Sequence, residues 1–192
     1  SLVYDDLPCM DDDDLRRGKA TVHKVFNEAN ALLGGASLLV YSFNLLSLDS
    51  FKINIKDKVK IITNFSEVTG AEGVLAGQYL DLLAENKNFE LNMKKFREIQ
   101  KKKTSLLIAF STLTGAILGK ASKKEQNEIY EIGLLMGNLF QIQDDILDLE
   151  GDEKKMGKKV NKDKGLNKAT IIRLKDINYA KKEVQRIGFK IK

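Results

Sequence analysis

Helical spacing is the feature that most limits what this chain can fold into. Apolar residues recur three and four positions apart through most of its 192 residues, and the chain contains a single proline. This spacing gathers apolar side chains on one stripe of a helix, and proline is the residue that helix interiors tolerate least. A chain of this length can also bury a sizeable core. The sequence therefore predicts an all-α fold, a helical bundle in a single domain.

Capping residues indicate where several of these helices begin. Asn27, Asn54 and Asn92 each precede a run with helical spacing, and Asn is a favoured N-cap. Ser122 and Glu125 form a capping box, in which the two side chains satisfy each other's backbone amides. A break is expected near Lys103–Thr104 in the fourth helix. The expected helices cover residues 27–48, 54–70, 72–85, 92–119, 122–149 and a stretch beyond 167.

Charge and composition exclude some classes of function. The net charge of +5 suits an anionic substrate but is too small to predict nucleic-acid binding. No apolar run approaches the roughly 20 residues that span a bilayer, so we expect no membrane insertion. The single cysteine, Cys9, excludes an internal disulfide and favours a reducing compartment such as the cytoplasm. The chain opens on Ser1 without a methionine, which leaves open a preceding targeting segment.

The first acidic loop, residues 5–14, holds six aspartates and is followed by two arginines. So many carboxylates repel one another unless a cation offsets them. Pro8 disfavours helix at the residue before it, so a helix should end or bend here and let Asp5 and Asp11 converge. Carboxylate oxygens suit magnesium, which binds one or two of them together with substrate phosphates. A calcium EF-hand is excluded because Arg16 occupies the position that requires glycine. A merely solvated acidic segment remains the alternative.

The second acidic motif, residues 141–148, falls within the expected helix 122–149. At the α-helical turn angle, Gln141, Asp144 and Asp148 fall within about 60° of arc. Apolar residues at positions such as 142 and 146 lie on the opposite side, so packing would fix the helix while its polar face aims at a common point. Asp145 lies off that narrow face and is expected to support it from behind. An exposed, functionless acidic face is the alternative.

These residues resemble the trans-isoprenyl diphosphate synthase family. The run Asp5-Asp6-Leu7-Pro8-Cys9-Met10-Asp11, which leads into Arg16-Arg17-Gly18, is similar to the family's first aspartate-rich motif. The run from Gln141 through Asp144-Asp145 to Asp148 is similar to the second. Further matches, in chain order, are Gly77-Gln78-x-x-Asp81, Lys103-Thr104 and Gly157-Lys158. The resemblance covers roughly residues 1–166.

The resemblance implies a helical isoprenoid synthase domain and a magnesium-dependent prenyltransferase. Its reaction would join isopentenyl diphosphate head to tail to an allylic diphosphate, dimethylallyl or geranyl, in isoprenoid biosynthesis. The product would be farnesyl diphosphate or geranylgeranyl diphosphate, with farnesyl favoured. The small residue Ser1, four positions before Asp5, would leave the floor of the product pocket open.

The resemblance also implies a role for each matching residue. Three magnesium ions are implied, two on Asp5 and Asp11 and one on Asp144, with Asp6 and Asp148 as further candidates. Cationic side chains would bind the diphosphates, and two oxygen dipoles would face the developing allylic cation. The allylic diphosphate would contact Arg16, Lys103 and Lys158, isopentenyl diphosphate would contact Arg17, and the dipoles would come from Thr104 and Gln141.

Departures from the family pattern leave alternatives open. The family's Gly-Lys-Arg signature and a histidine that precede the first motif are absent, so we expect a domain truncated at the N-terminus and also at the C-terminus. A terpene cyclase and a non-catalytic subunit of a heteromeric prenyl synthase are the alternatives. The Asp-Asp-Ile-Leu-Asp run at 144–148 argues against a cyclase, and the survival of both motifs argues against a non-catalytic subunit. A homodimer is expected, with contact through the apolar helices 28–48 and 105–119.

Overall fold

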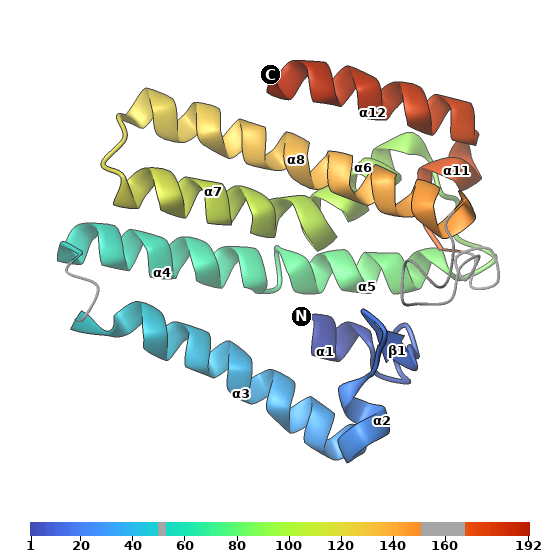
Figure 1. The fold of residues 1–192 in the computed structure, drawn as a ribbon, viewed down its shortest axis with the longest axis horizontal. Helices are drawn as coiled ribbons and strands as arrows, with labels where there is room; N and C mark the ends of the chain where they lie inside the picture. Colours follow the sequence, from blue (N-terminus) through green and yellow to red (C-terminus); the bar gives the residue numbers. More distant parts are fainter. Residues whose placement is uncertain (50–52, 151–167) are drawn as a thin grey trace. The chain divides into compact units, whose positions relative to one another are not determined.

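The computed structural model describes residues 1–49, 53–150 and 168–192. These residues form two compact units: the first contains residues 1–49, and the second contains residues 53–149 and 168–192. The all-α expectation is confirmed, because helices make up most of each unit (Figure 1). In the described ranges, strands are limited to β1 (Leu15–Arg16) and β2 (Lys19–Ala20). The expectation of a single domain stays a prediction.

Residues 1–49 of the first unit contain three α-helices and a small hairpin that the helical spacing did not predict. Its helices are α1 (Leu2–Asp5), α2 (Val22–Phe26) and α3 (Glu28–Ser47). In the hairpin, β1 and β2 pair antiparallel, with Leu15 opposite Ala20 and Arg16 opposite Lys19. Arg17 and Gly18 form its turn with φ of 54° and 76°, as a two-residue turn of type I′ requires.

The second unit contains seven α-helices and one π-helical segment, η2, in the part of the chain that the structure describes. Figure 1 shows α4 and α5 nearly end to end, with α7 running alongside α4. The elements are α4 (Ile55–Thr69), α5 (Val74–Ala84), α6 (Met93–Gln100), η2 (Lys101–Ser105), α7 (Leu106–Leu118), α8 (Lys123–Glu150), α11 (Ile171–Leu174) and α12 (Ile177–Ile191).

The capping predictions are confirmed. The side chains of Asn27, Asn54 and Asn92 each accept a hydrogen bond from a backbone N–H in the first turn of α3, α4 and α6. Ser122 and Glu125 form the reciprocal pair at the start of α8, at 2.6 and 3.3 Å.

The end of the chain departs from expectation, because two helices replace the single one predicted there. The side chains of Thr170 and Asp176 cap α11 and α12 respectively, so each helix has its own start signal. The expected terminator Gly151, the polar stretch 152–166 and the cap Asn167 lie outside the described residues.

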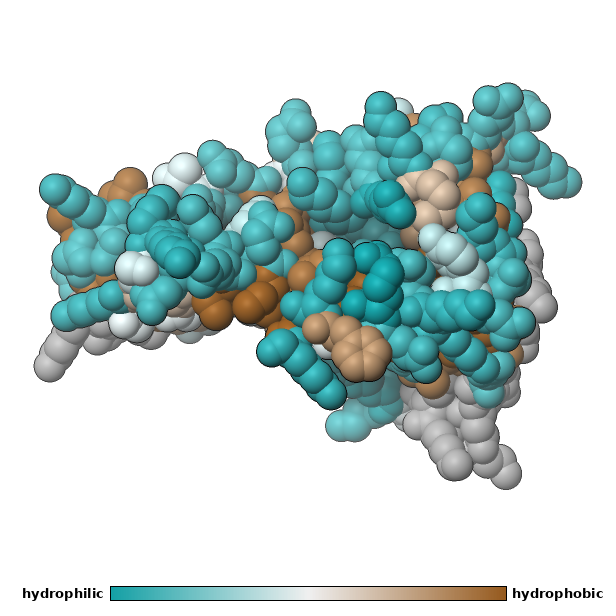
Figure 2. Space-filling view, turned by 90° about the horizontal axis from the view of Figure 1, so that it is seen from above, coloured by the Kyte–Doolittle hydropathy of each residue, from teal (hydrophilic) through white to brown (hydrophobic). Residues whose placement is uncertain are grey.

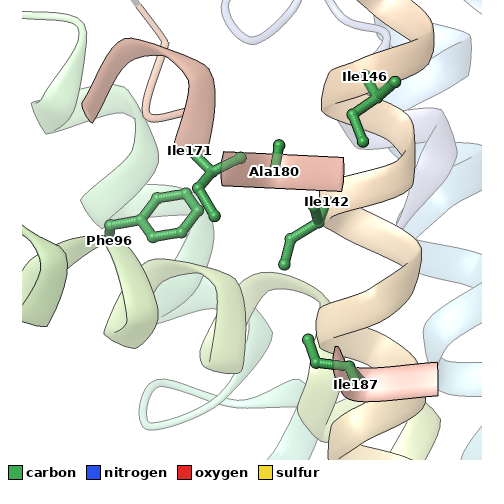
Figure 3. Close-up of a cluster of buried hydrophobic side chains, with 6 residues drawn as sticks. All are labelled: Phe96, Ile142, Ile146, Ile171, Ala180 and Ile187. Carbon is green, nitrogen blue, oxygen red and sulfur yellow. The ribbon is translucent and has the colours of Figure 1, made fainter. Parts of the chain in front are cut away.

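The core of the second unit is built where α6, α8, α11 and α12 meet (Figure 3). Ile142 and Ile146 come from the predicted apolar stripe of α8, and they are 2% and 6% exposed. Figure 3 shows them beside side chains from the other three helices, which are Phe96, Ile171, Ala180 and Ile187. This packing fixes the rotation of α8, and so it fixes the face on which the second acidic motif lies.

The surface combines polar areas with exposed apolar side chains, many of them on α3. The face seen in Figure 2 is mainly hydrophilic, with smaller hydrophobic areas between the polar side chains. Within the described residues one helix, α3, is long and apolar enough to cross a membrane by length and composition alone, although polar residues and glycines interrupt its apolar run. Many of its apolar side chains are exposed, among them Leu33 (64%) and Val40 (69%).

Candidate active site

The first acidic loop bends back on itself, as Pro8 led us to expect. Helix α1 ends at Asp5, and the backbone N–H of Asp11 donates to the carbonyl oxygen of Asp5 at 2.9 Å. Two further hydrogen bonds close the loop, from the N–H of Asp12 to Leu7 and from the N–H of Asp13 to Asp6. The structure therefore brings the backbones of Asp5 and Asp11 together, although helical spacing would have separated them.

Arg16 reaches from β1 into this loop and pairs with Asp6. Its Nε donates to Asp6 Oδ1 at 2.9 Å, its terminal nitrogen contacts the same oxygen, and Asp13 Oδ2 lies 3.7 Å away. Burial by itself would lower the pKa of Arg16, but the hydrogen bond to Asp6 and the neighbouring carboxylates raise it. Asp6, which is 4% exposed, thus holds a cation at the loop. Arg17 is exposed at the hairpin turn.

In the second unit, η2 is held between two helices that approach it very closely. A Cβ atom at Gly77 of α5 would lie 2.2 Å from the backbone nitrogen of Lys103, and one at Gly137 of α8 would lie 2.4 Å from Ser105 Cα. Only glycine permits such contact from both sides. A π-helical turn holds one residue more than an α-helical turn, and such turns occur often at functional sites. The expected break near Lys103–Thr104 is therefore a change of helix type.

Lys103 and Thr104 of η2 contact two different helices. Lys103 Nζ donates to Asp81 Oδ2 of α5 at 2.5 Å, and the Asp81 residue is 7% exposed. Thr104 Oγ1 donates to Gln141 Oε1 of α8 at 3.0 Å. The structure thus joins Thr104 to Gln141, two residues that the sequence placed in the same site from 37 positions apart.

Gln141 continues a hydrogen-bonded chain, which we call the amide network. Its Nε2 donates to Asp145 Oδ1 at 3.1 Å, and Asp145 Oδ2 accepts the backbone N–H of Ile171 at 3.0 Å. Asp145 is 4% exposed. The network therefore runs from Thr104 through Gln141 and Asp145 to the first residue of α11.

The other residues of the second acidic motif differ in exposure. Asp144 is half-buried, whereas Asp148 is buried. Lys158 lies outside the described residues. Among the residues that the structure describes, no three carboxylate, His or Cys side chains gather into a ready-made metal cage. The available oxygen ligands still fit magnesium, because that ion needs only one or two carboxylates when substrate phosphates supply the rest.

The sequence did not predict every contact that the site residues make. The pairing of Asp6 with Arg16 depends on the hairpin, whose only local signal in the sequence is the glycine at its turn, Gly18. The helical wheel placed Asp145 behind the polar face, and that is where the structure has it. The contact of Asp145 with Ile171 has no signal in the sequence, because it depends on how α11 packs.

The candidate site residues combine fixed cations with oxygen acceptors. Lys103 and Arg16 are fixed cations, and charge in a partly buried site acts more strongly than in water. The Thr104 hydroxyl directs its proton to Gln141, so its own lone pairs and the second lone pair of Gln141 Oε1 are available to a positive group. Each unit thus carries carboxylates beside cationic side chains.

Comparison with known proteins gives a consistent result. The family model for polyprenyl synthetase matches residues 1–190. Farnesyl diphosphate synthase of Geobacillus stearothermophilus is 42% identical over 185 residues, which are 96% of this chain and 62% of that protein. Chloroplastic geranylgeranyl pyrophosphate synthase of Catharanthus roseus is 34% identical over 98% of this chain and 52% of its own length.

A solved structure is also similar to this chain. A geranyltransferase from Helicobacter pylori, in complex with magnesium and isoprenyl diphosphate, superposes with a TM-score of 0.89 at 33% identity. The superposition covers 99% of this chain and 61% of that one. The chain therefore spans between about half and two thirds of the length of the proteins it matches.

Proposed function

Because this chain belongs to the polyprenyl synthetase family, the trans-isoprenyl diphosphate synthases, we propose that it is part of a chain-elongating prenyltransferase. The whole protein would condense isopentenyl diphosphate with dimethylallyl or geranyl diphosphate. Its product would be farnesyl diphosphate or geranylgeranyl diphosphate, the products for which its relatives are named.

The observation that supports this proposal most directly is the hydrogen bond between Thr104 and Gln141, at 3.0 Å. Both oxygens come from residues that the family motifs mark, on two elements that meet only in the folded unit. The preceding residue, Lys103, carries a cation that is held by Asp81 of α5. The reaction needs both a cation and oxygen dipoles, because the leaving group becomes negative while the allylic carbon becomes positive.

The chemistry assigns each group one task. Asp5, Asp11 and Asp144 would hold three magnesium ions, which neutralise charge on the diphosphate leaving group as Lewis acids. Lys103, Arg16 and, by position, Lys158 would bind that diphosphate, and Arg17 would bind isopentenyl diphosphate. The allylic carbon–oxygen bond breaks, with its electron pair leaving on the diphosphate. The double bond of isopentenyl diphosphate then forms the new carbon–carbon bond, and one proton departs to the released diphosphate.

The family also suggests the state in which this protein works. We propose a homodimer in the cytoplasm, with the exposed apolar face of α3 covered by a second subunit. Leu33 and Val40 are exposed and seven positions apart, so they lie on the same face of that helix. Such a face is more apolar than a monomer normally leaves in water.

A product assay tests the proposed function. The full-length protein would receive radiolabelled isopentenyl diphosphate, magnesium, and one allylic diphosphate per tube. We expect magnesium-dependent elongation that Asp144→Ala abolishes. The matched control is Glu131→Ala, which removes an exposed carboxylate thirteen positions earlier on α8 and should leave the activity unchanged.

The same assay separates the alternatives. Release of a cyclic hydrocarbon from farnesyl diphosphate, without isopentenyl diphosphate, would indicate a terpene cyclase. No turnover in any tube would favour a non-catalytic subunit of a heteromeric synthase. Equal loss of activity in Asp144→Ala and Glu131→Ala would refute the role given to Asp144.

A further inference from the structure

The amide network contains one group with two possible orientations, the side-chain amide of Gln141. A glutamine amide can face either way, and its hydrogen-bond partners decide which end points where. At one end of the network the backbone N–H of Ile171 can only donate, and at the other end the Thr104 hydroxyl can donate or accept. Asp145 stands between Ile171 and Gln141, and a carboxylate can only accept.

These constraints leave one arrangement for Gln141. Asp145 Oδ2 accepts from Ile171 at 3.0 Å, so its other oxygen Oδ1 faces Gln141 as an acceptor. The NH₂ group of Gln141 must therefore face Asp145, at 3.1 Å, and its carbonyl oxygen must face Thr104. The buried charge of Asp145 thereby determines which end of the Gln141 dipole faces the reacting centre.

We propose that Asp145 is a positioning residue that sets the direction of the Gln141 amide and, through it, the oxygen lone pairs offered to the allylic cation. This inference rests on the proposed function. It goes beyond the motif itself, because it gives Asp145 a task that involves neither metal nor substrate. It also links the site to α11, since the same carboxylate holds the first N–H of that helix.

An isosteric change provides a sharp test. In Asp145→Asn the side-chain oxygen must still accept from Ile171, because the backbone N–H cannot turn, so the new NH₂ group faces Gln141. Gln141 then turns over, accepts with its oxygen from position 145, and presents its NH₂ group to Thr104, whose hydroxyl can accept. Every hydrogen bond of the network is kept, while a positive dipole end now faces the cation.

The expected result is a loss of kcat on the order of 100-fold, by analogy with removal of one group that stabilises transition-state charge. The KM values for both diphosphates, the magnesium dependence and the melting temperature should remain close to those of the wild type. The double variant Gln141→Glu with Asp145→Asn keeps the net charge and restores an oxygen facing Thr104. We expect it to recover at least about a tenth of the wild-type kcat.

A second readout is independent of activity. The side-chain NH₂ signals of Gln141 in the ¹⁵N-labelled protein, assigned with Gln141→Leu, should move in Asp145→Asn because their acceptor changes from a carboxylate to a hydroxyl. Wild-type protein without condensation activity would overturn the proposed function, and the NMR signals would still report the amide direction. Active wild type with unchanged kcat or unmoved signals in Asp145→Asn, or a double variant no better than the single one, would overturn the positioning role.

Discussion

The ammonium group of Lys103 is held in one position by its surroundings. Its ammonium group lies against Asp81, the side chains being 22% and 9% exposed, and it stands on a π-helical turn that two glycines clamp. An ammonium on a flexible stem would otherwise sample many positions. The ion pair therefore fixes where the cation lies.

At this scale we predict the effect of Asp81→Asn on stability. The change leaves the Lys103 ammonium facing a neutral amide in a mostly buried position, which should lower the free energy of unfolding by about 1–3 kcal/mol. Urea unfolding followed by circular dichroism would measure it.

Glu98→Gln is the matched control, because Glu98 pairs with the neighbouring Lys102 at 3.8 Å on the surface. Exposed pairs contribute between about 0 and 1 kcal/mol, so little change is expected. Equal effects of the two substitutions would show that the Asp81–Lys103 pair stabilises the fold no more than an exposed ion pair does.

At the scale of helix packing, the glycines that face η2 determine how closely α5 and α8 approach it. Gly137→Ala would place a Cβ atom 2.4 Å from Ser105 Cα, so α8 and η2 must move apart. We expect a loss of about 1–3 kcal/mol, as for other overpacked cores. Thermal unfolding would measure the loss, and kcat should fall with it because Thr104 and Gln141 move apart.

Gly115→Ala gives the opposite expectation on the neighbouring helix α7. A Cβ atom there meets no atom within 4 Å, so alanine should stabilise the helix by up to about 1 kcal/mol. Stabilisation by both alanines would show that the close approach at Gly137 is not required.

The contribution of the first turn of α8 to folding stability should depend on pH. Hydrogen bonds from the side chain and then the backbone N–H of Ser122 lower the pKa of Glu125. Because this pKa is lower in the folded state, the stabilisation is present above the ordinary Glu pKa and is lost as pH falls through the folded value. The stability difference between wild type and Glu125→Gln should therefore narrow on acidification below about pH 4.

Denaturant titrations across the acid range would follow that difference. Glu131→Gln, on the exposed face of the same helix, serves as the reference. A Glu125→Gln difference that stays constant with pH would argue against the charged capping box.

At the scale of the whole molecule, the exposed apolar face of α3 should govern assembly. We predict that Leu33→Lys with Val40→Lys converts the proposed dimer to a monomer, because two ammonium groups cannot be buried in an apolar contact. Sedimentation velocity would measure the mass. Phe189→Lys on α12, which changes a side chain that is 77% exposed, should leave the dimer intact. Dissociation in the control alone would place the contact elsewhere.

The sequence determined those features that depend on neighbours along the chain. Asn27, Asn54, Asn92 and Ser122 begin their helices as predicted, because a cap contacts an amide two or three residues away. The polar and apolar faces of α8 followed from helical periodicity alone. The bend at Pro8 also followed from local sterics. The assignment of residues to metals and substrates remains a prediction from the motifs.

Only the tertiary structure decided how distant residues meet. Lys103 pairs with Asp81, Thr104 with Gln141, and Asp145 with Ile171, across separations of 22, 37 and 26 positions. None of these contacts follows from local preferences, because each requires two helices to pack at one distance and one rotation. Gly77 and Gly137 set that distance at η2, and the buried core of α8 sets the rotation. Helix type and helix ends are local properties, whereas the direction of a buried amide depends on every element that packs around it.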